Sequence, residues 1–405
     1  MNHDLFDADQ ADHFPPTPAA AQARLAAVRP GEYARTRNHL DGAVTRLSPY
    51  ITHGFLSLPQ VLQAVHARHP LDAQHKFVFE LGWRAYFHHV WQHRGAAIFE
   101  SLHQGVLPDA AYARELPADI AAGCTGLPVI DRAVHELHAT GWLHNHARMW
   151  LASYVVHLRK VHWRTGADWL YGHLLDGDLA SNHLSWQWVA GTGSHKPYLF
   201  NAENVARYAP APWHSPSSVI DTDYETLERM AASTRPVLHS KSQASPEERV
   251  PSLWTVPPET PSSGDLRAAF DAVHAQALQG REVQLLHPWS LGAAPQPGAL
   301  RLGVCIADFH AVWPWSARRW QFVITRLRAQ CEQLWWVDAA TLRAALAGAA
   351  AVHGVADPHL QPWLQGLALQ AAPRLFAEPA QPCHSFSKYW QKVSRGVFAA
   401  ASPSQ

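Results

Sequence analysis

The first half of the chain carries apolar residues at the spacing of helices rather than strands. Apolar positions recur every three or four residues, which places them on one face of a helix. The segments with this pattern are 58–65, 77–91, 129–137 and 147–158. Two of them follow a hydroxyl residue and a proline, at Ser57 to Pro59 and Thr125 to Pro128, which is typical of a helix start. The pattern predicts an all-α first half.

The pattern changes in the second half, where short apolar runs alternate with amphipathic segments. The runs have the length of buried strands and lie at 300–306, 333–337, 349–352 and 374–376. Amphipathic segments at 316–330 and 339–346 stand between them. Because strands that alternate with helices usually pair in parallel, we expect a small α/β layer domain.

Residues 210–264 separate these halves and hold nine of the 30 prolines, together with many Ser, Thr and acidic residues. Such a composition cannot bury enough apolar surface to fold alone, so it predicts a linker or a wrapping segment. The expected organisation is therefore mainly α: a helical domain at 1–210, a Pro/Ser-rich linker at 211–264, and a small α/β domain of unassigned role at 265–405.

Composition narrows the class of protein. With 405 residues, 47% hydrophobic and 16% charged, the chain is long and apolar enough for a sizeable core, which excludes a disordered polyampholyte. Its 33 basic and 33 acidic side chains exclude a strongly basic nucleic-acid arm. No run reaches the roughly 18 apolar residues of a membrane span, and residues 1–18 are acidic and contain proline, unlike a signal peptide. We expect a cytoplasmic protein with no membrane partner.

Cysteine and histidine spacing gives no metal site. The four cysteines lie far apart without a C-x-x-C pair, which argues against a disulfide framework and a thiolate zinc site. His135 and His138 lack the spacing of the helical two-histidine zinc motif, and His144 and His146 fall on opposite helix faces. Of 28 histidines, 21 lie in residues 1–215, and we expect most of them to be structural or exposed.

One predicted helix carries polar groups on the stripe that should face the core. Glu80, Trp83, Arg84 and Phe87 stand at i, i+3, i+4 and i+7. A carboxylate, an indole and a guanidinium on such a stripe suggest a polar cavity. The alternative is a surface Glu and Arg that flank a packed Trp.

Two further segments repeat this mixture. Asn145, Arg148 and Met149 would face one compartment from a helix. Asp176 and Asp178 flank a glycine, so they could bind a divalent cation, accept hydrogen bonds from a ligand, or stand as two solvated acids in a turn. Trp186 and Trp188 follow; on a helix they point about 200° apart, so one can face a pocket while the other faces inward.

Together these segments resemble the flavin-binding helical domain of DNA photolyases and cryptochromes. The resemblance runs from about residue 33 to residue 200, and five motifs carry it in order. They are Thr45-Arg-Leu-Ser-Pro-Tyr-Ile51, Glu80-Leu-Gly-Trp-Arg84, Thr125-Gly-Leu-Pro-Val-Ile-Asp131, Gly141-Trp-Leu-His-Asn-His-Ala-Arg-Met149, and Asp176-Gly-Asp through Trp186-Gln-Trp188.

The resemblance implies a folded-back FAD and a set of residues that hold it. Arg148 and Asp176 match the family's ion pair beside the isoalloxazine, with Asp178 nearby and Asn182 aimed at the flavin N5. An amide suits that position because it can hydrogen-bond either N5 or N5–H. Contacts with the diphosphate and ribityl region, partly through backbone N–H groups and hydroxyls, are implied for Tyr33, Thr45, Arg46, Leu47 and Ser48.

The resemblance also implies a pocket for a flipped-out cyclobutane pyrimidine dimer, with ultraviolet-damaged DNA as the partner. Trp83 and Trp188 would stack on the bases, and Glu80 and Asn145 would bond their edges. Arg37 would contact a phosphate. Photolyases for (6-4) lesions carry histidines where this chain has Asn145 and Met149, so the cyclobutane assignment is preferred. The residues expected to act in the reaction are Glu80, Asn145, Asn182, Trp186 and Trp163.

Three departures from the family stand out. Because the flavin-domain motifs begin by about residue 33, we expect the family's usual N-terminal α/β antenna domain to be missing. The inner tryptophans of the family's electron wire match Trp186 and Trp163, but the outer one falls near Ala110, where Tyr112 is a candidate substitute. The C-terminal α/β segment, with Trp313, Trp315 and Trp320, is either a relocated antenna equivalent or a separate interaction module, and these indoles are expected to serve packing.

Three functions follow from the resemblance. The first is a light-driven DNA repair lyase, in which blue light excites reduced FAD, an electron passes to the dimer, the ring splits and the electron returns. The second is a cryptochrome-like photoreceptor that signals to a protein partner through its C-terminal domain. In the third, the flavin is retained only as part of the structural core.

Overall fold

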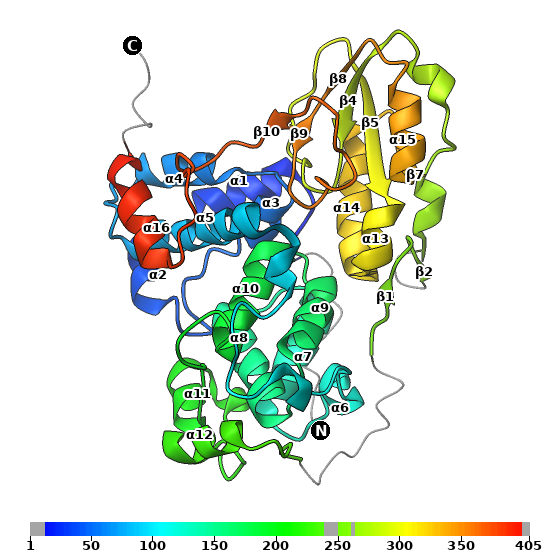
Figure 1. Ribbon diagram of the computed structural model, residues 1–405. Helices are drawn as coiled ribbons and strands as arrows, with labels where there is room; N and C mark the ends of the chain where they lie inside the picture. The colour runs from blue at the N-terminus through cyan, green and yellow to red at the C-terminus, as the bar shows by residue number, and fades with distance from the viewer. Residues whose placement is uncertain (1–12, 239–249, 261–263, 399–405) are drawn as a thin grey trace, which may run out of the picture.

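The computed structural model describes residues 13–238, 250–260 and 264–398 (Figure 1). Its first part is all-α, as expected. The helices are α1 (Pro18–Ala26), α2 (Pro30–Thr36), α3 (Ser48–Thr52), α4 (Leu58–His66), α5 (Lys76–Arg94), α6 (Ala118–Ala122), α7 (Pro128–Thr140), α8 (Asn145–Ser153), α9 (Trp163–His173), α10 (Leu179–Ala190), α11 (Ala202–Tyr208) and α12 (Tyr224–Ala232). The four helices predicted from apolar spacing are confirmed, and the one at 147–158 is α8 continued by a π-helical turn, Tyr154–Leu158.

The second part contains a four-stranded parallel sheet, which confirms the predicted α/β layer. The strand order is β7 (Gln333–Val337), β5 (Leu300–Ile306), β4 (Glu282–Leu286) and β8 (Ala351–His353). In register, Leu285 lies opposite Leu302 and Val304 lies opposite Trp335. The helices between strands are α13 (Ala307–Val312), α14 (Ala317–Gln330) and α15 (Ala339–Leu346).

One strand prediction was wrong, and one strand was missed. The predicted strand at 374–376 does not form; Arg374 instead pairs with Glu378 in a loop. The inner strand β4 was missed because buried Gln284 interrupts its apolar run. The Gln284 amide donates to the carbonyl of Ala294 and accepts from the N–H of Gln296, so its polar atoms are satisfied inside the fold.

Short strand pairs tie the remaining segments together. β1 (Leu253–Trp254) pairs antiparallel with β6 (Trp315–Ser316), so the segment that follows the helical part contributes to the α/β part. The other pairs are β2 (Glu259–Thr260) with β3 (Gly264–Asp265), and β9 (Val355–Ala356) with β10 (Gln370–Ala371). Residues 239–249 and 261–263 lie outside the described part of the chain.

The two parts share one apolar core that runs from α1–α5 into the sheet. Backbones approach closely at this junction: a Cβ on Gly54, whose φ is +70°, would lie 2.3 Å from the carbonyl oxygen of Trp289. The buried ring of His53 reaches the carbonyl oxygens of Pro288 and Leu175, at 2.6 and 2.8 Å. Burial lowers the pKa of His53 to about 3, so its ring is neutral at pH 7.

The C-terminal helix α16 (Phe386–Val393) leaves the α/β part and packs on α5, on the side of the molecule away from the sheet (Figure 1). Its buried face consists of Phe386, Tyr389, Trp390 and Val393. Trp390 covers Gly82, where an added Cβ would lie 2.3 Å from the indole. Glycine is therefore required at position 82 for this close helix packing.

Neutral histidines begin three of the helices. The Nδ1 atoms of His75, His144 and His162 accept hydrogen bonds from backbone N–H groups in the first turns of α5, α8 and α9, at 3.1 to 3.2 Å. A ring nitrogen can accept only if it carries no proton. Burial, together with His146 and Arg148, lowers the pKa of His144 to about 3. Part of the histidine enrichment thus serves as helix caps.

We predict that Gly82→Ala destabilises the protein and loosens α16. The new methyl group collides with the Trp390 ring, and overpacking of this kind costs about 1–3 kcal/mol. Chemical denaturation measures the loss. Gly31→Ala in α2 is the control, because its nearest neighbour is a side-chain atom of Arg35 at 3.8 Å. Equal stability of the Gly82 variant and the wild type would contradict the packing described.

We predict that His144 makes stability fall as the pH drops below about 6.5. The unfolded imidazole takes up a proton near its ordinary pKa of about 6.5, whereas the folded ring stays neutral down to about 3. His144→Asn keeps a capping oxygen and does not titrate. Between about pH 7 and 5 it should lose about 2 kcal/mol less unfolding free energy than the wild type.

Urea denaturation at both pH values measures this difference. His69→Asn is the matched control, because His69 is exposed in the folded protein and should leave the pH dependence unchanged. Parallel pH dependence in the wild type and the His144 variant would show that this cap does not titrate as described.

Candidate functional site

The turn between α9 and α10 holds the two acids singled out in the sequence. Asp176 and Asp178 are buried, with 5% and 2% of their surface exposed, so the turn does not present two solvated acids. Asp178 is the N-cap of α10 and accepts from the N–H of Ser181 at 2.8 Å. Asp176 accepts two hydrogen bonds from Nη2 of Arg148 on α8, at 2.7 and 3.0 Å. The predicted pair of Arg148 and Asp176 therefore forms.

Asp178 is held by the helix that carries Glu80 and Trp83. Its Oδ2 lies 2.9 Å from Nε2 of His88 and 3.3 Å from Nη2 of Arg84, both on α5. Burial alone would raise the pKa of Asp178, but His88 and Arg84 outweigh it and hold the pKa well below its usual range. This carboxylate is therefore ionised at neutral pH and fixes α5 against α10.

The α/β part also holds this turn, which the sequence did not suggest. Arg319 of α14 is fully buried and donates to the carbonyls of Tyr171 and Gly177, at 3.0 and 2.7 Å. Its guanidinium lies over the rings of Trp315 and Tyr171. A Cβ on Gly177 would lie 2.4 Å from Nη1 of Arg319. Because Gly177 has no Cβ, the Arg319 guanidinium can lie directly against the backbone of this turn.

Further contacts complete the turn from both sides. The hydroxyl of Thr52 donates to the Asp176 carbonyl at 3.1 Å, and the N–H of Leu179 donates to Nε2 of His359 at 3.1 Å. The sequence analysis missed Arg319, His359, Thr52 and His88. Only His88 carried a signal, since it stands four residues after Arg84 on the same predicted helix.

Asn182 lies one turn into α10 and is 9% exposed. Its Nδ2 donates to the carbonyl of Ala167 at 2.8 Å, which orients the amide and directs Oδ1 to other partners. Arg84 and Arg148 keep 20% and 25% of their side-chain surface exposed while their inner sides are paired. An oriented amide and two partly open guanidiniums suit a ligand with anionic groups and N–H donors.

The residues expected on the diphosphate side lie in two separate places, one beside Phe77 and the other beside Trp142. Tyr33 is half-buried beside Phe77, and burial together with Glu80 raises its pKa. Ser48 accepts from the indole of Trp142 at 3.2 Å, and the Arg46 guanidinium lies over the same indole. The Leu47 side chain is 1% exposed and packs in the core. The Leu47 N–H lies 3.4 Å from Oγ1 of Thr45.

Arg46 and Trp142 also line a cavity of about 230 Å³. It opens beside α7, and its other lining residues include Phe14, Arg132 and Glu136. Of the expected cofactor residues, only Arg46 reaches it. This cavity is therefore separate from the turn that holds Asp176 and Asp178.

The expected substrate-side residues come from α2, α5, α8 and α10. Nη2 of Arg37 lies 3.6 Å from Oε1 of Glu80, and burial raises the pKa of Glu80. Nδ2 of Asn145 lies 3.4 Å from the Met149 sulfur. His146, next to Asn145 in the sequence, has its Nδ1 2.5 Å from the backbone carbonyl oxygen of Asn38, and the side-chain Oδ1 of Asn38 accepts from Arg37.

The two expected stacking residues differ in their surroundings. Trp188 is 39% exposed, and its ring lies 5.9 Å from that of Tyr198. Trp83 is half-buried, and one of its faces is already stacked on Phe386 of α16, with ring centres 4.0 Å apart and planes 8° apart. One face of the Trp83 indole is therefore covered by Phe386.

The inner tryptophans are buried on α9 and α10. Trp186 packs across Gly166 of α9, and the Trp163 indole donates to Ser101 at 2.9 Å. Two series of neighbouring aromatic rings extend from Trp163. One passes through His162 to Tyr112, with ring centres 5.6 and 6.3 Å apart. The other passes through His183 to Trp313 of the α/β part, with centres 6.5 and 5.5 Å apart.

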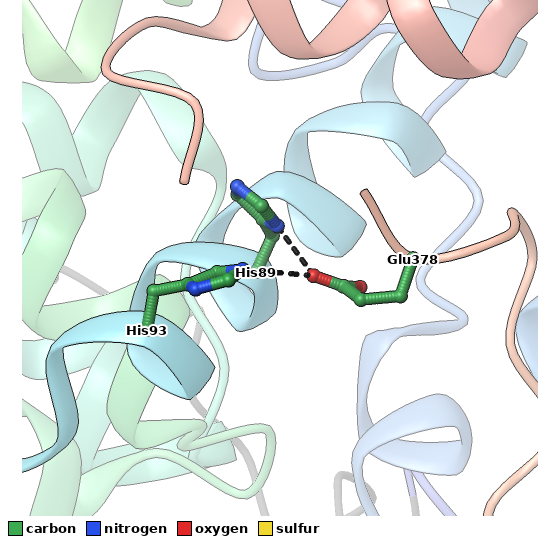
Figure 2. Close-up of side chains that lie close together, drawn as sticks. All are labelled: His89, His93 and Glu378. Atoms are coloured by element: carbon green, nitrogen blue, oxygen red, sulfur yellow. Dashed lines mark hydrogen bonds and ion pairs between the residues drawn. The ribbon is translucent and has the colours of Figure 1, made fainter. Parts of the chain in front are cut away.

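One group of side chains has the composition of a metal site. Figure 2 shows His89 and His93 of α5 facing Glu378, with their ligand atoms within 4.8 Å of one another. The N–H of Cys383 donates to Nε2 of His89 at 2.8 Å, so the ring proton is on Nδ1 and is donated to Glu378. His89 thus offers no lone pair toward Glu378. His89 is hydrogen-bonded to Glu378 and His93 lies 3.7 Å from the same carboxylate oxygen, so these three residues form a clasp that holds the segment before α16 on α5.

Comparison with known proteins gives the helical part a family. Residues 77–211 match the family model described as the FAD binding domain of DNA photolyase. A deoxyribodipyrimidine photo-lyase of Escherichia coli is 34% identical over 47% of this chain and 43% of its own length. One of Streptomyces griseus is 37% identical over 38% and 33%. A cryptochrome DASH of Idiomarina loihiensis is 33% identical over 44% and 42%.

A solved Synechocystis cryptochrome is 30% identical over 47% of this chain and 43% of its own, with a TM-score of 0.42. The chain therefore spans less than half the length of each of these relatives. Among the described residues, no helix combines the length and apolarity needed to cross a membrane.

FAD is the cofactor of this domain, and the residues at the turn fit it. Arg84 and Arg148 present cationic surface suited to an anionic ligand, and Oδ1 of Asn182 is directed away from the bond that orients it. Asp176 and Asp178 supply carboxylates beside these groups. The helical part of this chain thus carries a FAD-binding domain of the photolyase/cryptochrome type.

Proposed function

We propose that the protein is a blue-light-driven lyase that splits cyclobutane pyrimidine dimers in DNA. The observation that carries this proposal is Trp188, a large indole left 39% exposed on the same helix that buries Trp186 and Asn182. Exposed indoles are suited to stack on extruded bases. A function that used the flavin alone would not require one there. Relatives named deoxyribodipyrimidine photo-lyase support this function.

In this proposal, the chain holds the flavin through the turn and its partners. Arg148, Asp176 and Asp178 bind and orient it, with Arg84 beside Asp178, and Asn182 directs Oδ1 toward the flavin N5. Tyr33 and the backbone of residues 45–48 line the diphosphate side. Reduced FAD, excited by blue light, supplies the electron that opens the dimer and takes it back. Trp163 and Trp186 provide the aromatic path by which electrons reach the cofactor.

The substrate side positions the lesion. Trp188 and the open face of Trp83 stack on the two bases, while Glu80 and Asn145 bond their edges and Met149 fills the space between them. Because burial raises the pKa of Glu80, its protonated form is more accessible than that of an ordinary glutamate and can donate to a base carbonyl. Arg37 lies beside Glu80 and contacts a phosphate.

The second candidate function is a cryptochrome-like light sensor. It is favoured by the bond between Arg319 of the α/β part and the turn at Gly177. A change of charge beside Asp176 and Asp178 would act directly on a residue of the C-terminal domain, which could pass the change to a protein partner. Relatives named cryptochrome are consistent with it.

A repair assay separates these functions. We expect purified protein with reduced FAD under blue light to split the cyclobutane dimers in an irradiated oligonucleotide. Trp188→Ala should weaken binding of the damaged strand about tenfold, because stacking contributes about 1–3 kcal/mol per base, and should leave flavin content unchanged. Tyr224→Ala is the control, since Tyr224 is 46% exposed on α12. Intact dimers after illumination of the wild type would reject the repair function.

We predict that Arg319 is a positioning residue for the flavin site. Arg319→Met keeps a long apolar side chain but leaves the carbonyls of Tyr171 and Gly177 without their donor. It also removes a positive charge that lies near Asp176 and Asp178. Removing one partner of a buried charged network costs about 3–5 kcal/mol. Flavin absorbance per protein should fall several-fold, together with the unfolding midpoint. The neighbouring exposed Arg318→Met is the control, and unchanged flavin content in the Arg319 variant would contradict this role.

A further inference from the structure

The C-terminal helix α16 has one face without a partner in the described fold. Its apolar face is covered by α5, whereas Lys388 and Lys392 are exposed one turn apart, and Arg395 is exposed in the next turn. Residues 379–405 contain these three basic side chains and no acidic one. We call Lys388, Lys392 and Arg395 the basic face of α16. It is a local concentration of positive charge in a chain with no net charge.

The helix that carries this basic face contacts, through its apolar side, the residues expected to receive the lesion. Phe386, in the first turn of α16, is stacked on Trp83. Glu80 stands one turn before Trp83 on α5 and pairs with Arg37 at the end of α2. Both α16 and α2 pack on α5. A strand that enters the pocket at Trp83 therefore passes near α16.

The position of α16 is fixed rather than loose. The clasp of His89, His93 and Glu378 anchors the segment that leads into the helix (Figure 2). Phe386 and Trp390 then pack on Phe79 at ring distances of 4.7 and 5.3 Å. Cations on a helix held in this way lose little freedom when they bind, which favours docking of an extended anion.

The chemistry favours a nucleic-acid backbone over a membrane surface. A helix that inserts into a lipid interface buries its apolar face there, but the apolar face of α16 is already packed on α5. What α16 presents is a row of flexible cations, which suits successive phosphates. Residues 1–215 hold 17 basic and 18 acidic groups, so the helical domain supplies no general attraction for DNA. A flipped-base pocket needs phosphate contacts beside it to set register.

We infer that the basic face of α16 docks the sugar-phosphate backbone of duplex DNA beside the base pocket. This inference rests on the proposed repair function and assigns part of its substrate binding to the C-terminal segment, outside residues 77–211 that match the family. The lysines contact phosphates and carry no sequence preference. They hold the duplex while Trp83 and Trp188 take the bases.

The test is a salt series with the flavin-loaded full chain and a fluorescent duplex about three helical turns long, with and without one dimer. Lys388→Ala/Lys392→Ala should weaken both duplexes several-fold at low salt. It should also reduce the slope of log affinity against log salt by about 1.8, since each phosphate contact contributes about 0.9. Flavin content should stay at the wild-type value.

Arg114→Ala/Arg281→Ala is the matched control, because it removes two exposed arginines from other elements and should leave the slope unchanged. Arg395→Gln provides a single-charge variant, expected to reduce the slope by about 0.9. If the Lys388/Lys392 variant bound DNA as tightly as the wild type, with the same slope of log affinity against log salt, the inference would be overturned. The inference would also be overturned if this variant kept its affinity for DNA but lost binding to vesicles of anionic lipid. Failure of the proposed function looks different: the wild type itself would leave dimers intact.

Discussion

The site depends on keeping two buried carboxylates, Asp176 and Asp178, two positions apart in one turn. Each needs its own cation, and these come from different helices: Arg148 of α8 serves Asp176, and Arg84 of α5 serves Asp178. A third cation, Arg319, approaches the backbone between them. Because an unpaired buried charge costs several kcal/mol, α5, α8 and α14 are held in one arrangement. The helices that carry the expected flavin and base contacts are positioned by the same ion pairs.

Local spacing was enough to predict much of this arrangement. Glu80, Trp83 and Arg84 share a helix face, and the pair of Arg148 and Asp176 forms as the family resemblance implied. These relations depend on residues close in sequence or on a motif of fixed order. The parallel sheet followed from the alternation of apolar runs and amphipathic segments, with β5 and β7 at their predicted positions.

What the sequence left out depends on contacts between distant residues. Arg319 and His359 reach the turn from the α/β part across more than 140 positions, and no local pattern marks them. Strand β4 was hidden by Gln284, whose burial is possible only because Ala294 and Gln296 happen to satisfy its amide. The stacking of Phe386 on Trp83 required knowing where the C-terminal segment returns. Such pairings are set by tertiary packing, which periodicity does not report.

The return of α16 to α5 limits how a base can meet Trp83. An indole has two faces, and Phe386 covers one of them at a plane angle of 8°. In the proposed repair function, a base can therefore stack only on the opposite face, and the covered face gives the indole a fixed orientation. Gly82 makes this possible, since Trp390 occupies the space of a Cβ one residue before Trp83. The segment that closes one side of the aromatic wall is the same segment that carries Lys388 and Lys392, so the position of the wall and the position of the cations are set by one packing interface.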